Sequence, residues 1–342
     1  MSLKNLSVVN KIPKQFKDKL LNRRINQIFR RFENSFNPNT NFIVAVSGGP
    51  DSLALAFLTK IYSLKYNLHP KYYIVDHKLR DESTLEAIMV KKILKKNKID
   101  SQVLTIRGKK PLGNIQSFAR RKRYDLLFSK CKKLKIKDLV LGHHIDDMIE
   151  NFFLRMMRGS GLRGLVSLDE RTKINKINLL RPLLGFNKKD LIFFSKNIFN
   201  FYVDDPSNYN TEFRRTKIRN FIKELQKNGL DNKKFLLTLE NLKHSDKALK
   251  FYVEKNKDKN SFFNLEKKEL ILKEDFFNNS YEVIFRSLSD LIKLVGMKYN
   301  LARGKKIDKV LNKIINNTLI KETLGGCVIK KVNHTVIMTK EH

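Results

Sequence analysis

The stretch Val44-Ala45-Val46-Ser47-Gly48-Gly49-Pro50-Asp51-Ser52 organises this chain. It begins in an apolar run, residues 42–46, that is too short and too uniformly apolar for an amphipathic helix, and this predicts a strand buried on both faces. Two glycines then turn the chain, and the apolar residues 53–58 predict a helix. Such a turn gathers backbone N–H groups at the positive end of a helix dipole, which makes an anion site.

Asp51 is the unusual residue of this loop. Gly48 and Gly49 let the backbone approach a phosphate and Ser47 and Ser52 add hydroxyl donors, whereas a carboxylate repels a phosphate. A divalent cation between the two removes the conflict, so Asp51 predicts Mg²⁺ shared with a nucleotide. The alternative is a tight turn in which Asp51 or Ser52 only caps the helix. The complete Ser-Gly-Gly-Pro-Asp-Ser string after a buried strand favours the nucleotide site.

Strand and helix patterns alternate beyond this loop. Strand patterns recur at residues 72–75, 102–106 and 139–141, with helical patterns at 83–96 and 115–134 between them. This alternation predicts an α/β fold with a doubly wound parallel sheet. Ligands of such sheets lie beyond the C-terminal ends of the strands, so the polar residues that follow each strand are the candidates for a site.

Two of these strand ends carry candidate residues. Backbone near Val75 is a candidate wall for an adenine, with His77 beside it, although Asp76 and His77 equally fit a capped helix start. In a helix beginning near Ile145, Asp147 and Glu150 share one face, as do Asp146 and Glu150. Clustered carboxylates need a shared cation or a ligand's amine. Mg²⁺ or a lysine ammonium fits the glycine loop better than a transition metal does, with a plain helix start as the alternative.

Basic residues gather near the same strand ends. Arg120 and Arg123 are three apart on a predicted helix and could reach phosphates, with a solvated basic helix as the alternative. The glycine-rich stretch 155–165 contains Arg158 and Arg163, and we expect it to form no regular element. A loop of this kind suits an RNA or phosphate clamp.

The charge balance points to a polyanionic partner. Seventy Lys and Arg against 34 Asp and Glu give a formal net charge of +36, and nucleic acid is the commonest partner of such a field. A lysine-rich solvated surface without a partner is the alternative. Cys131 and Cys327 form no pair motif, so neither a disulfide framework nor a metal site is indicated. With no spanning segment visible, we expect a soluble protein of the reducing cytoplasm that has no membrane partner.

The chain is long enough for more than one domain. We expect a basic helical extension over residues 1–40, a catalytic domain over 41–228 and a smaller, mainly helical C-terminal domain over 229–342 that ends in a β-hairpin turning at Asn333-His334.

The glycine loop resembles the pyrophosphate-binding loop (PP-loop) of the N-type ATP pyrophosphatases and lacks the Gly-Lys-Ser/Thr ending of a Walker loop. Residues 42–222 as a whole resemble the tRNA(Ile)-lysidine synthase family. The motifs that carry the resemblance occur in the family's order: Ser-Gly-Gly-Pro-Asp-Ser, Val-Asp-His-Lys-Leu-Arg, Asn-Ile-Gln-Ser-Phe-Ala-Arg, His-His-Ile-Asp-Asp-Met-Ile-Glu, Arg-Gly-Ser-Gly-Leu, Arg-Pro-Leu-Leu and Asp-Pro-Ser-Asn.

The resemblance implies that ATP and Mg²⁺ are used to adenylate the wobble cytidine of a CAU-anticodon tRNA(Ile), and that free L-lysine then displaces AMP. It also implies roles for individual residues. The catalytic set is Asp51, His143, Asp147, Glu150 and Arg219. The ATP-binding set is Ser47, Gly48, Gly49, Pro50, Asp51, Ser52, Val75 and His77. The metal ligands are Asp51 and Asp146, and the tRNA-binding set is Arg120, Arg123, Arg158, Arg163, Arg215 and the C-terminal domain.

Some positions depart from the family pattern, and rival functions remain. Met148 and Asn151 stand where Gln and Thr are more usual, and Thr216 replaces an Asn, which leaves the duties of Arg215 and Arg219 open. A tRNA thiolase is the nearest rival, although it needs a cysteine pair. A small-molecule amidating ligase would not need this charge, and a non-catalytic RNA-binding module would release no pyrophosphate. The oligomeric state also stays open, with a homodimer among the options.

Overall fold

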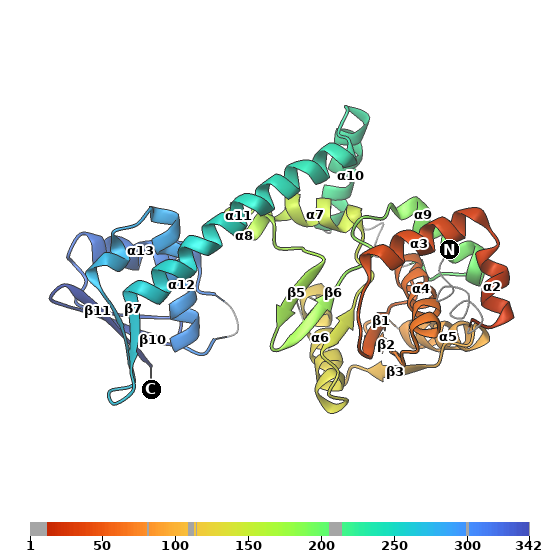
Figure 1. The fold of residues 1–342 in the computed structure, drawn as a ribbon, viewed down its shortest axis with the longest axis horizontal. Coiled ribbons are helices and arrows are strands. Elements are labelled where there is room, and N and C mark those ends of the chain that lie inside the picture. Colours follow the sequence, from red (N-terminus) through yellow and green to blue (C-terminus); the bar gives the residue numbers. More distant parts are fainter. Residues whose placement is uncertain are drawn as a thin grey trace, which may run out of the picture. The chain divides into compact units, whose positions relative to one another are not determined.

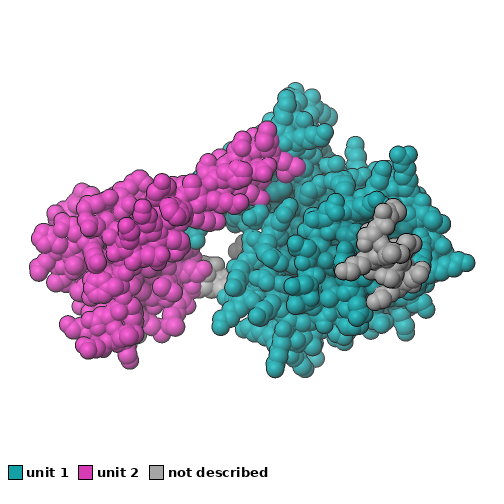
Figure 2. Space-filling view, in the orientation of Figure 1, with its two compact units in different colours: residues 1–235 teal, residues 236–342 magenta. Residues whose placement is uncertain are grey.

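The computed structural model describes residues 12–80, 82–108, 113, 115–204, 214–298 and 301–341. The chain divides into two compact units, residues 1–235 and 236–342 (Figure 2). Helix α11 (Asn232–Asn260) begins in the first unit and continues into the second.

The first unit is an α/β domain (Figure 1). Its elements in chain order are α2 (Lys14–Leu20), α3 (Arg23–Ser35), β1 (Phe42–Val46), α4 (Pro50–Tyr66), β2 (Lys71–Asp76), α5 (Ser83–Lys96), β3 (Ser101–Thr105), α6 (Ile115–Lys133), β4 (Asp138–Val140), α7 (Ile145–Met156), α8 (Leu162–Leu165), β5 (Arg171–Ile174), β6 (Ile177–Leu180), α9 (Lys188–Phe199) and α10 (Arg214–Lys227).

The sheet confirms the predicted fold class. Its strand order is β3-β2-β1-β4-β6-β5, with parallel pairing from β3 through to β6 and antiparallel pairing of β5 with β6. Strands β1 and β4 are neighbours although β2 and β3 come between them in the chain. This reversal is a topological switch point, where the loops after two adjacent strands leave a crevice between them.

Alternating residues of β1 face two hydrophobic cores. Phe42, Val44 and Val46 lie in a core with residues of α3, α4, α5 and α9, whereas Ile43 lies in a second core with Leu127 of α6. Both faces of the strand are therefore buried, which explains why its sequence is apolar throughout.

The N-terminal segment contributes directly to the first core. Asn22 separates α2 from α3 and caps α3, because its side chain accepts hydrogen bonds from the N–H groups of Arg24 and Ile25. Phe16 and Phe32 are buried, and the Phe16 ring lies 5.5 Å from that of Phe57 on α4. These helices therefore pack as part of the first unit.

One local prediction is wrong. The glycine-rich stretch 155–165 was expected to be irregular, but α7 continues to Met156 and α8 forms a short turn of helix. The N–H groups of Gly164 and Leu165 donate to the carbonyl of Gly161, so glycines at the ends of this turn do not prevent it.

The second unit combines helices with an antiparallel sheet of order β7-β8-β11-β10-β9. After α11 its elements are β7 (Ser261–Asn264), β8 (Glu269–Leu272), η2 (Glu274–Phe277), α12 (Tyr281–Val295), α13 (Gly304–Ile315), β9 (Lys321–Leu324), β10 (Cys327–Val332) and β11 (Thr335–Lys340). Leu288 and Leu311 from the helices pack with Ile329 and Met338 from the sheet. The predicted hairpin turn is present, with Asn333 at a φ of 51°.

Candidate active site

The glycine loop between β1 and α4 is held by Ser52. Its Oγ accepts hydrogen bonds from the N–H groups of Ser47 and Gly48, at 3.1 and 3.0 Å, and donates one to the carbonyl of Gly49 at 3.0 Å. Gly48 has a φ of +91°, and a Cβ there would lie 2.5 Å from Cγ2 of Val90. The fold therefore requires glycine at position 48, because the positive φ and the nearby Val90 both exclude a side chain.

Three helix N-termini meet at this loop. Gly142, at the end of β4, packs so tightly on α4 that a Cβ would lie 3.3 Å from the backbone of Asp51. The N–H of Ile145 at the start of α7 donates to the carbonyl of Phe186, just before α9. The Oγ of Ser195 on α9 donates to the carbonyl of Pro50 at 2.6 Å. The starts of α4, α7 and α9, which are the positive ends of these helices, thus lie near one another, and this favours anions there.

Asp51 has a cationic neighbour that the sequence did not indicate. The Nζ of Lys188, the first residue of α9, donates to Oδ2 of Asp51 at 2.5 Å. The Nε2 of His144 lies 3.7 Å from the same oxygen. The Oδ1 of Asp51 is buried and accepts no hydrogen bond from the part of the chain that the structure describes. A carboxylate oxygen in that condition is suited to an additional cation.

His144 joins the glycine loop to the acids of α7. Its Nδ1 accepts a hydrogen bond from the N–H of Asp146, which places the imidazole proton on Nε2. That proton faces Asp147 Oδ2 at 3.5 Å as well as Asp51. Asp147 in turn accepts a hydrogen bond from the His144 N–H at 3.0 Å, which completes a capping box at the start of α7.

The two aspartates of α7 differ in acidity. Burial raises the pKa of Asp146, with Asp147 and Asp51 adding to this effect and His144 and Lys188 opposing it. Burial also acts to raise the pKa of Asp147, but His144 and the backbone hydrogen bond from its N–H outweigh it, so the pKa of Asp147 is lowered. Asp147 is therefore the more firmly ionised of the pair.

His143 is kept neutral by its surroundings. Burial lowers its pKa to about 3, and Arg181, Arg120 and Arg123 lower it further while Asp147 opposes them. Its Nδ1 is buried and has no hydrogen-bond partner among the described residues. The predicted tRNA-binding residues Arg120 and Arg123 thus lie near a predicted catalytic histidine.

Arg181 is a further cation of this region that the predicted sets omitted. It is buried, and its Nη1 donates to the carbonyl of Asp169 at 2.7 Å and to Oγ1 of Thr172 at 3.0 Å. Burial lowers the pKa of Arg181, Tyr124 raises it and Arg120 lowers it again. The guanidinium of Arg120 lies over the Tyr124 ring, 5.3 Å from its centroid. Cations from α6 and from the segment after β6 therefore surround one tyrosine.

Glu150 and Arg219 form an ion pair that joins α7 to α10. The Nε of Arg219 donates to Oε1 of Glu150 at 2.5 Å, and the Glu150 side chain is 7% exposed. Burial lowers the pKa of Arg219, but the hydrogen bond and charge of Glu150 more than compensate, so the pKa is raised. The structure thus brings together two residues of the predicted catalytic set.

Asp76 and His77, at the end of β2, have different surroundings. Asp76 accepts hydrogen bonds from the Lys78 N–H and from the hydroxyls of Ser83 and Thr84, so it holds the start of α5. Val75 pairs with Leu104 of β3 within the sheet. His77 lines a pocket of about 540 Å³, whose other lining residues are Lys78, Leu79, Thr105, Ile106, Arg107, Gly108 and Phe118. The glycine loop does not line this pocket.

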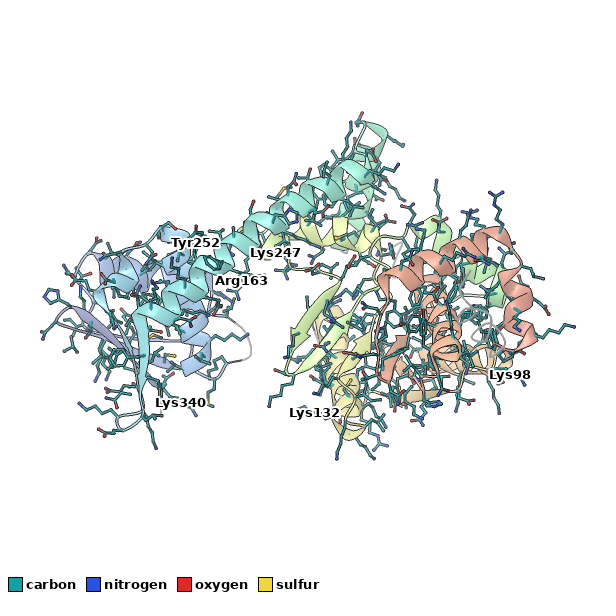
Figure 3. The ribbon with its side chains drawn as sticks, in the orientation of Figure 1. Lys98, Lys132, Arg163, Lys247, Tyr252 and Lys340 are labelled. Atoms are coloured by element: carbon teal, nitrogen blue, oxygen red, sulfur yellow. The ribbon has the colours of Figure 1, made fainter. Side chains whose placement is uncertain are left out.

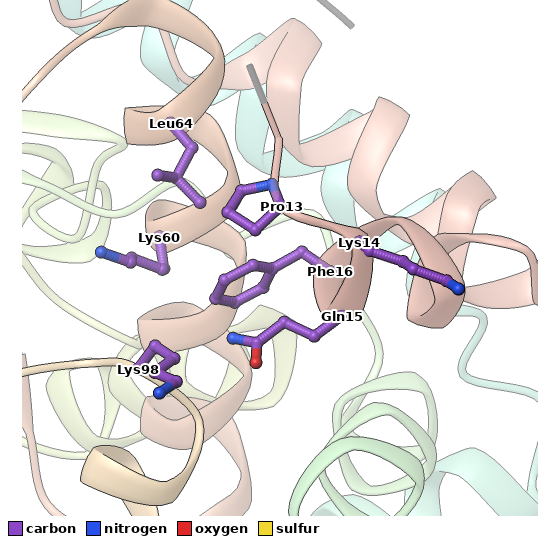
Figure 4. Close-up of a pocket in the computed structure, with 7 residues that line it drawn as sticks. All are labelled: Pro13, Lys14, Gln15, Phe16, Lys60, Leu64 and Lys98. Atoms are coloured by element: carbon purple, nitrogen blue, oxygen red, sulfur yellow. The ribbon is translucent and has the colours of Figure 1, made fainter. Parts of the chain in front are cut away.

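The remaining predicted residues lie elsewhere. Arg158 is exposed after α7, Arg163 is half-buried on α8, and the side chain of Arg215 and the Asp-Pro-Ser-Asn motif lie outside the described residues. Figure 3 shows Arg163 on the ribbon together with other basic side chains. A pocket of about 440 Å³ beside α2 contains none of the predicted residues; it is lined by Pro13, Lys14, Gln15, Phe16, Lys60, Leu64 and Lys98 (Figure 4).

The acidic side chains of the site can bind a metal ion only together with oxygen atoms from a bound nucleotide or from water. Within the described ranges, no group of three or more His, Cys, Asp or Glu side chains is placed to bind a metal ion. The free Oδ1 of Asp51 and the carboxylate of Asp146 are hard oxygen donors of the kind that Mg²⁺ prefers. The residues present therefore fit an Mg²⁺ ion that completes its coordination with phosphate oxygens and water.

A parallel sheet with a Ser-Gly-Gly-Pro-Asp-Ser loop at its switch point defines an ATP-using enzyme of the PP-loop class, and residues 18–226 match the PP-loop domain family. The fold is also similar to that of the U34-tRNA thiolase NcsA from Methanococcus maripaludis. That likeness has a TM-score of 0.56 at 20% identity and covers 65% of this chain and 80% of that one.

Two curated relatives narrow the class. The tRNA(Ile)-lysidine synthase of Wolbachia pipientis wMel is 33% identical over 307 residues, which are 89% of this chain and 71% of that protein. The tRNA(Ile)-lysidine synthase of Orientia tsutsugamushi (strain Boryong) is 31% identical over 319 residues, 90% of this chain and 71% of that one. The chain belongs to the tRNA(Ile)-lysidine synthase family, whose members modify tRNA with the use of ATP. None of the described helices has the length and apolarity to cross a membrane.

Proposed function

We propose that this enzyme joins free L-lysine to C2 of the wobble cytidine of a CAU-anticodon tRNA(Ile), forming lysidine with release of AMP and pyrophosphate. The observation that carries the proposal is the meeting of the glycine loop with the acids of α7. Gly142 packs against the backbone of Asp51, and His144 faces both Asp51 and Asp147. One site thus offers a phosphate cradle and, beside it, carboxylates for a cationic substrate.

In the first step, the O2 atom of cytidine attacks the α-phosphorus of ATP, and the bond to pyrophosphate breaks. The N–H groups at the start of α4 would orient the leaving pyrophosphate, since they lie at the positive end of that helix. Asp51 and Asp146 would hold Mg²⁺, which would supply charge neutralisation for the leaving pyrophosphate. His77 and the backbone near Val75 are the proposed neighbours of the adenosine, because they lie at the next strand end.

In the second step, the ε-amine of lysine attacks C2, and the C2–O2 bond breaks with release of AMP. Asp147 is firmly ionised and attracts the ammonium, while Glu150 is engaged by Arg219 and acts by positioning that cation. Because Asp146 is assigned to Mg²⁺, Asp147 is also the proposed acceptor for the proton that the amine loses. Neutral His143 can accept a hydrogen bond from the incoming amine.

The basic residues are proposed to bind the tRNA. Arg120 and Arg123 lie near His143 and would contact phosphates next to the reacting nucleotide. Arg158, Arg163 and Arg215 would contact phosphates farther along the RNA. The second unit would add contacts through exposed lysines such as Lys247 of α11 (Figure 3). Contacts of this type are weakened by salt. Because the proposed substrates are found in the cytoplasm, we place the enzyme there.

The test is incorporation of labelled lysine into a tRNA(Ile) transcript with a CAU anticodon, with ATP and Mg²⁺ present. A methionine-type tRNA with the same anticodon is the control. Label in the first transcript alone is expected. Pyrophosphate release without label in either transcript would keep the adenylating step and refute lysine as the nucleophile.

A tRNA thiolase is the rival from the same fold class. Both cysteines of the sequence are buried, Cys131 in the first unit and Cys327 in the second, and neither belongs to a pair motif. Burial raises the pKa of each thiol to about 11, which opposes the thiolate that sulfur transfer needs. These observations favour ligation of an amine.

A further inference from the structure

Lys188 contributes a cation to the site from an element that neither the glycine loop nor the acidic helix includes. It opens α9, and its Nζ lies 2.5 Å from Asp51 Oδ2 across 137 residues of sequence. The second half of α9 packs on α4, because Ser195 donates to the carbonyl of Pro50 and the ring of Phe194 lies 5.8 Å from that of Phe57. The packing of α9 on α4 therefore positions the Lys188 ammonium beside Asp51.

Helix stability does not explain a lysine at this position. A cation in the first turn of a helix is opposed by the helix dipole, and Lys188 and Lys189 both lie in the first turn of α9. The side chain of Lys188 is 36% exposed, and an ion pair with that degree of exposure contributes little to folding. The position is better explained by what the ammonium does in the site.

The Lys188 ammonium can pair either with Asp51 or with a phosphate bound beside it. Asp51 uses Oδ2 for Lys188 while its Oδ1 accepts no hydrogen bond from the described residues. Asp51 lies in the first turn of α4 and Lys188 in the first turn of α9, so both helix N-termini, which favour a phosphate, are near this lysine. A divalent cation on Asp51 would repel the ammonium, and a phosphate bound at the helix ends would attract it.

We propose that Lys188 is a pyrophosphate-binding residue that Asp51 holds in place until nucleotide and metal arrive. Without ligand, the ammonium neutralises Asp51. With ligand, it leaves Asp51 to the divalent cation and binds the non-bridging oxygens of the pyrophosphate part of ATP. This assignment rests on the proposed use of ATP at the glycine loop and is independent of the identity of the nucleophile.

The experiment measures two affinities of the full-length protein with neither ATP nor tRNA present. Binding of Mn²⁺ alone is followed by electron paramagnetic resonance, and binding of inorganic pyrophosphate without divalent metal is followed by calorimetry. The variants are Lys188→Gln and Lys188→Arg. Lys189→Gln is the matched control, since Lys189 is exposed on the same turn of α9.

We expect Lys188→Gln to bind Mn²⁺ about 5-fold more tightly and pyrophosphate about 10-fold more weakly, as loss of one charge-assisted hydrogen bond implies. Lys188→Arg should keep pyrophosphate binding within about 3-fold, because it keeps the charge. Lys189→Gln should change neither affinity. Weakening of both affinities in Lys188→Gln would mean that the lysine only supports the fold, and an unchanged pyrophosphate affinity would equally overturn the proposal.

The outcome separates this proposal from the proposed function. Failure of lysine incorporation into tRNA would leave the two affinities of Lys188→Gln as predicted. Conversely, if the enzyme incorporates lysine into tRNA but the Lys188→Gln variant binds pyrophosphate normally, only the proposed role of Lys188 is refuted. Should Lys188→Gln fail to fold, Lys188→Arg decides, because weakening of pyrophosphate binding beyond about 10-fold in that charge-preserving variant contradicts the proposal.

Discussion

Arg219 on α10 donates a hydrogen bond to Glu150 on α7 across 69 residues of sequence, and this pair anchors α10 beside the acids of the site. The ring of Phe221 on the same helix packs edge-on against Phe153, with centroids 5.7 Å apart. A polar contact and an apolar contact thus join α10 to neighbouring turns of α7.

The ion pair should couple the two helices measurably. In a double-mutant cycle of Arg219→Met and Glu150→Gln, we expect a coupling free energy of about 1–2 kcal/mol, because Glu150 is buried while Arg219 is partly exposed. Urea unfolding of the four proteins measures it. Lys217→Met, an exposed change on the same helix, should alter stability by less than about 0.5 kcal/mol. Additive effects of the two site variants would contradict the coupling.

Gly48 and Gly49 should respond very differently to alanine. At Gly48, the φ of +91° and the contacts with Val90 and Val203 exclude a Cβ, so Gly48→Ala should cost about 2 kcal/mol or more of stability and weaken ATP binding. At Gly49, the φ is −68° and the nearest atom to a Cβ is 4.0 Å away, so Gly49→Ala should fold normally. Thermal unfolding compares the two, and equal melting temperatures would show that the loop is not constrained as described.

Asp51→Asn removes the charge that couples metal and phosphate. We expect ATP–pyrophosphate exchange in the presence of tRNA to fall by about 100-fold or more, while the affinity for tRNA stays within about 2-fold. Asp18→Asn, an exposed change on α2, is the control. Exchange at the normal rate in Asp51→Asn would remove this residue from the site.

His143 should stay neutral where an ordinary histidine is charged. Its pKa is lowered by burial and by three arginines, whereas the unfolded imidazole titrates near 6.5. Because the unfolded chain binds this proton more tightly, the stability that depends on His143 is complete above about pH 6.5 and is lost as the pH falls towards its folded pKa. Nitrogen chemical shifts of labelled histidine at pH 5.5, assigned with His143→Gln, should show a neutral ring. An imidazolium signal would refute the neutral state.

The second unit is expected to contribute to tRNA affinity through salt-sensitive contacts. Replacing Lys247, Lys255 and Lys259, all exposed on α11, with Gln should weaken tRNA binding. It should also reduce the slope of log K against log salt concentration by up to about 2 to 3. Filter binding across a salt series measures the slope. An unaltered slope would show that this part of α11 does not contact the RNA backbone.

Much of the fold could be predicted because its signals are local. The uniform hydrophobicity of residues 42–46 predicted a strand covered on both faces, and β1 occupies those residues. Helix α5 begins at Ser83 and ends at Lys96 as its periodicity indicated. The glycine loop was recognisable because the turn into α4 demands a positive φ at Gly48, a requirement that one residue type satisfies best.

Other features depend on contacts between distant segments. The pairing of Lys188 with Asp51 and of Arg219 with Glu150 could not be predicted, because these lysine and arginine residues stand among many others in a chain with 70 such cations. Their significance comes from the packing of α9 on α4 and of α10 on α7. The same holds for His143, whose pKa is lowered by burial and then by arginines of α6 and of the segment after β6.

Asp76 illustrates the boundary between the two kinds of information. Its position after a strand fitted both a ligand-binding residue and a helix cap, and only the hydrogen bonds from Ser83 and Thr84 identify it as structural. The residues along the chain thus specified strands β1 to β4, the glycine loop and the acidic helix start, because backbone conformation and hydrophobic periodicity are local properties. The partners of each charged side chain followed from folding, because they depend on which helix ends the sheet brings together.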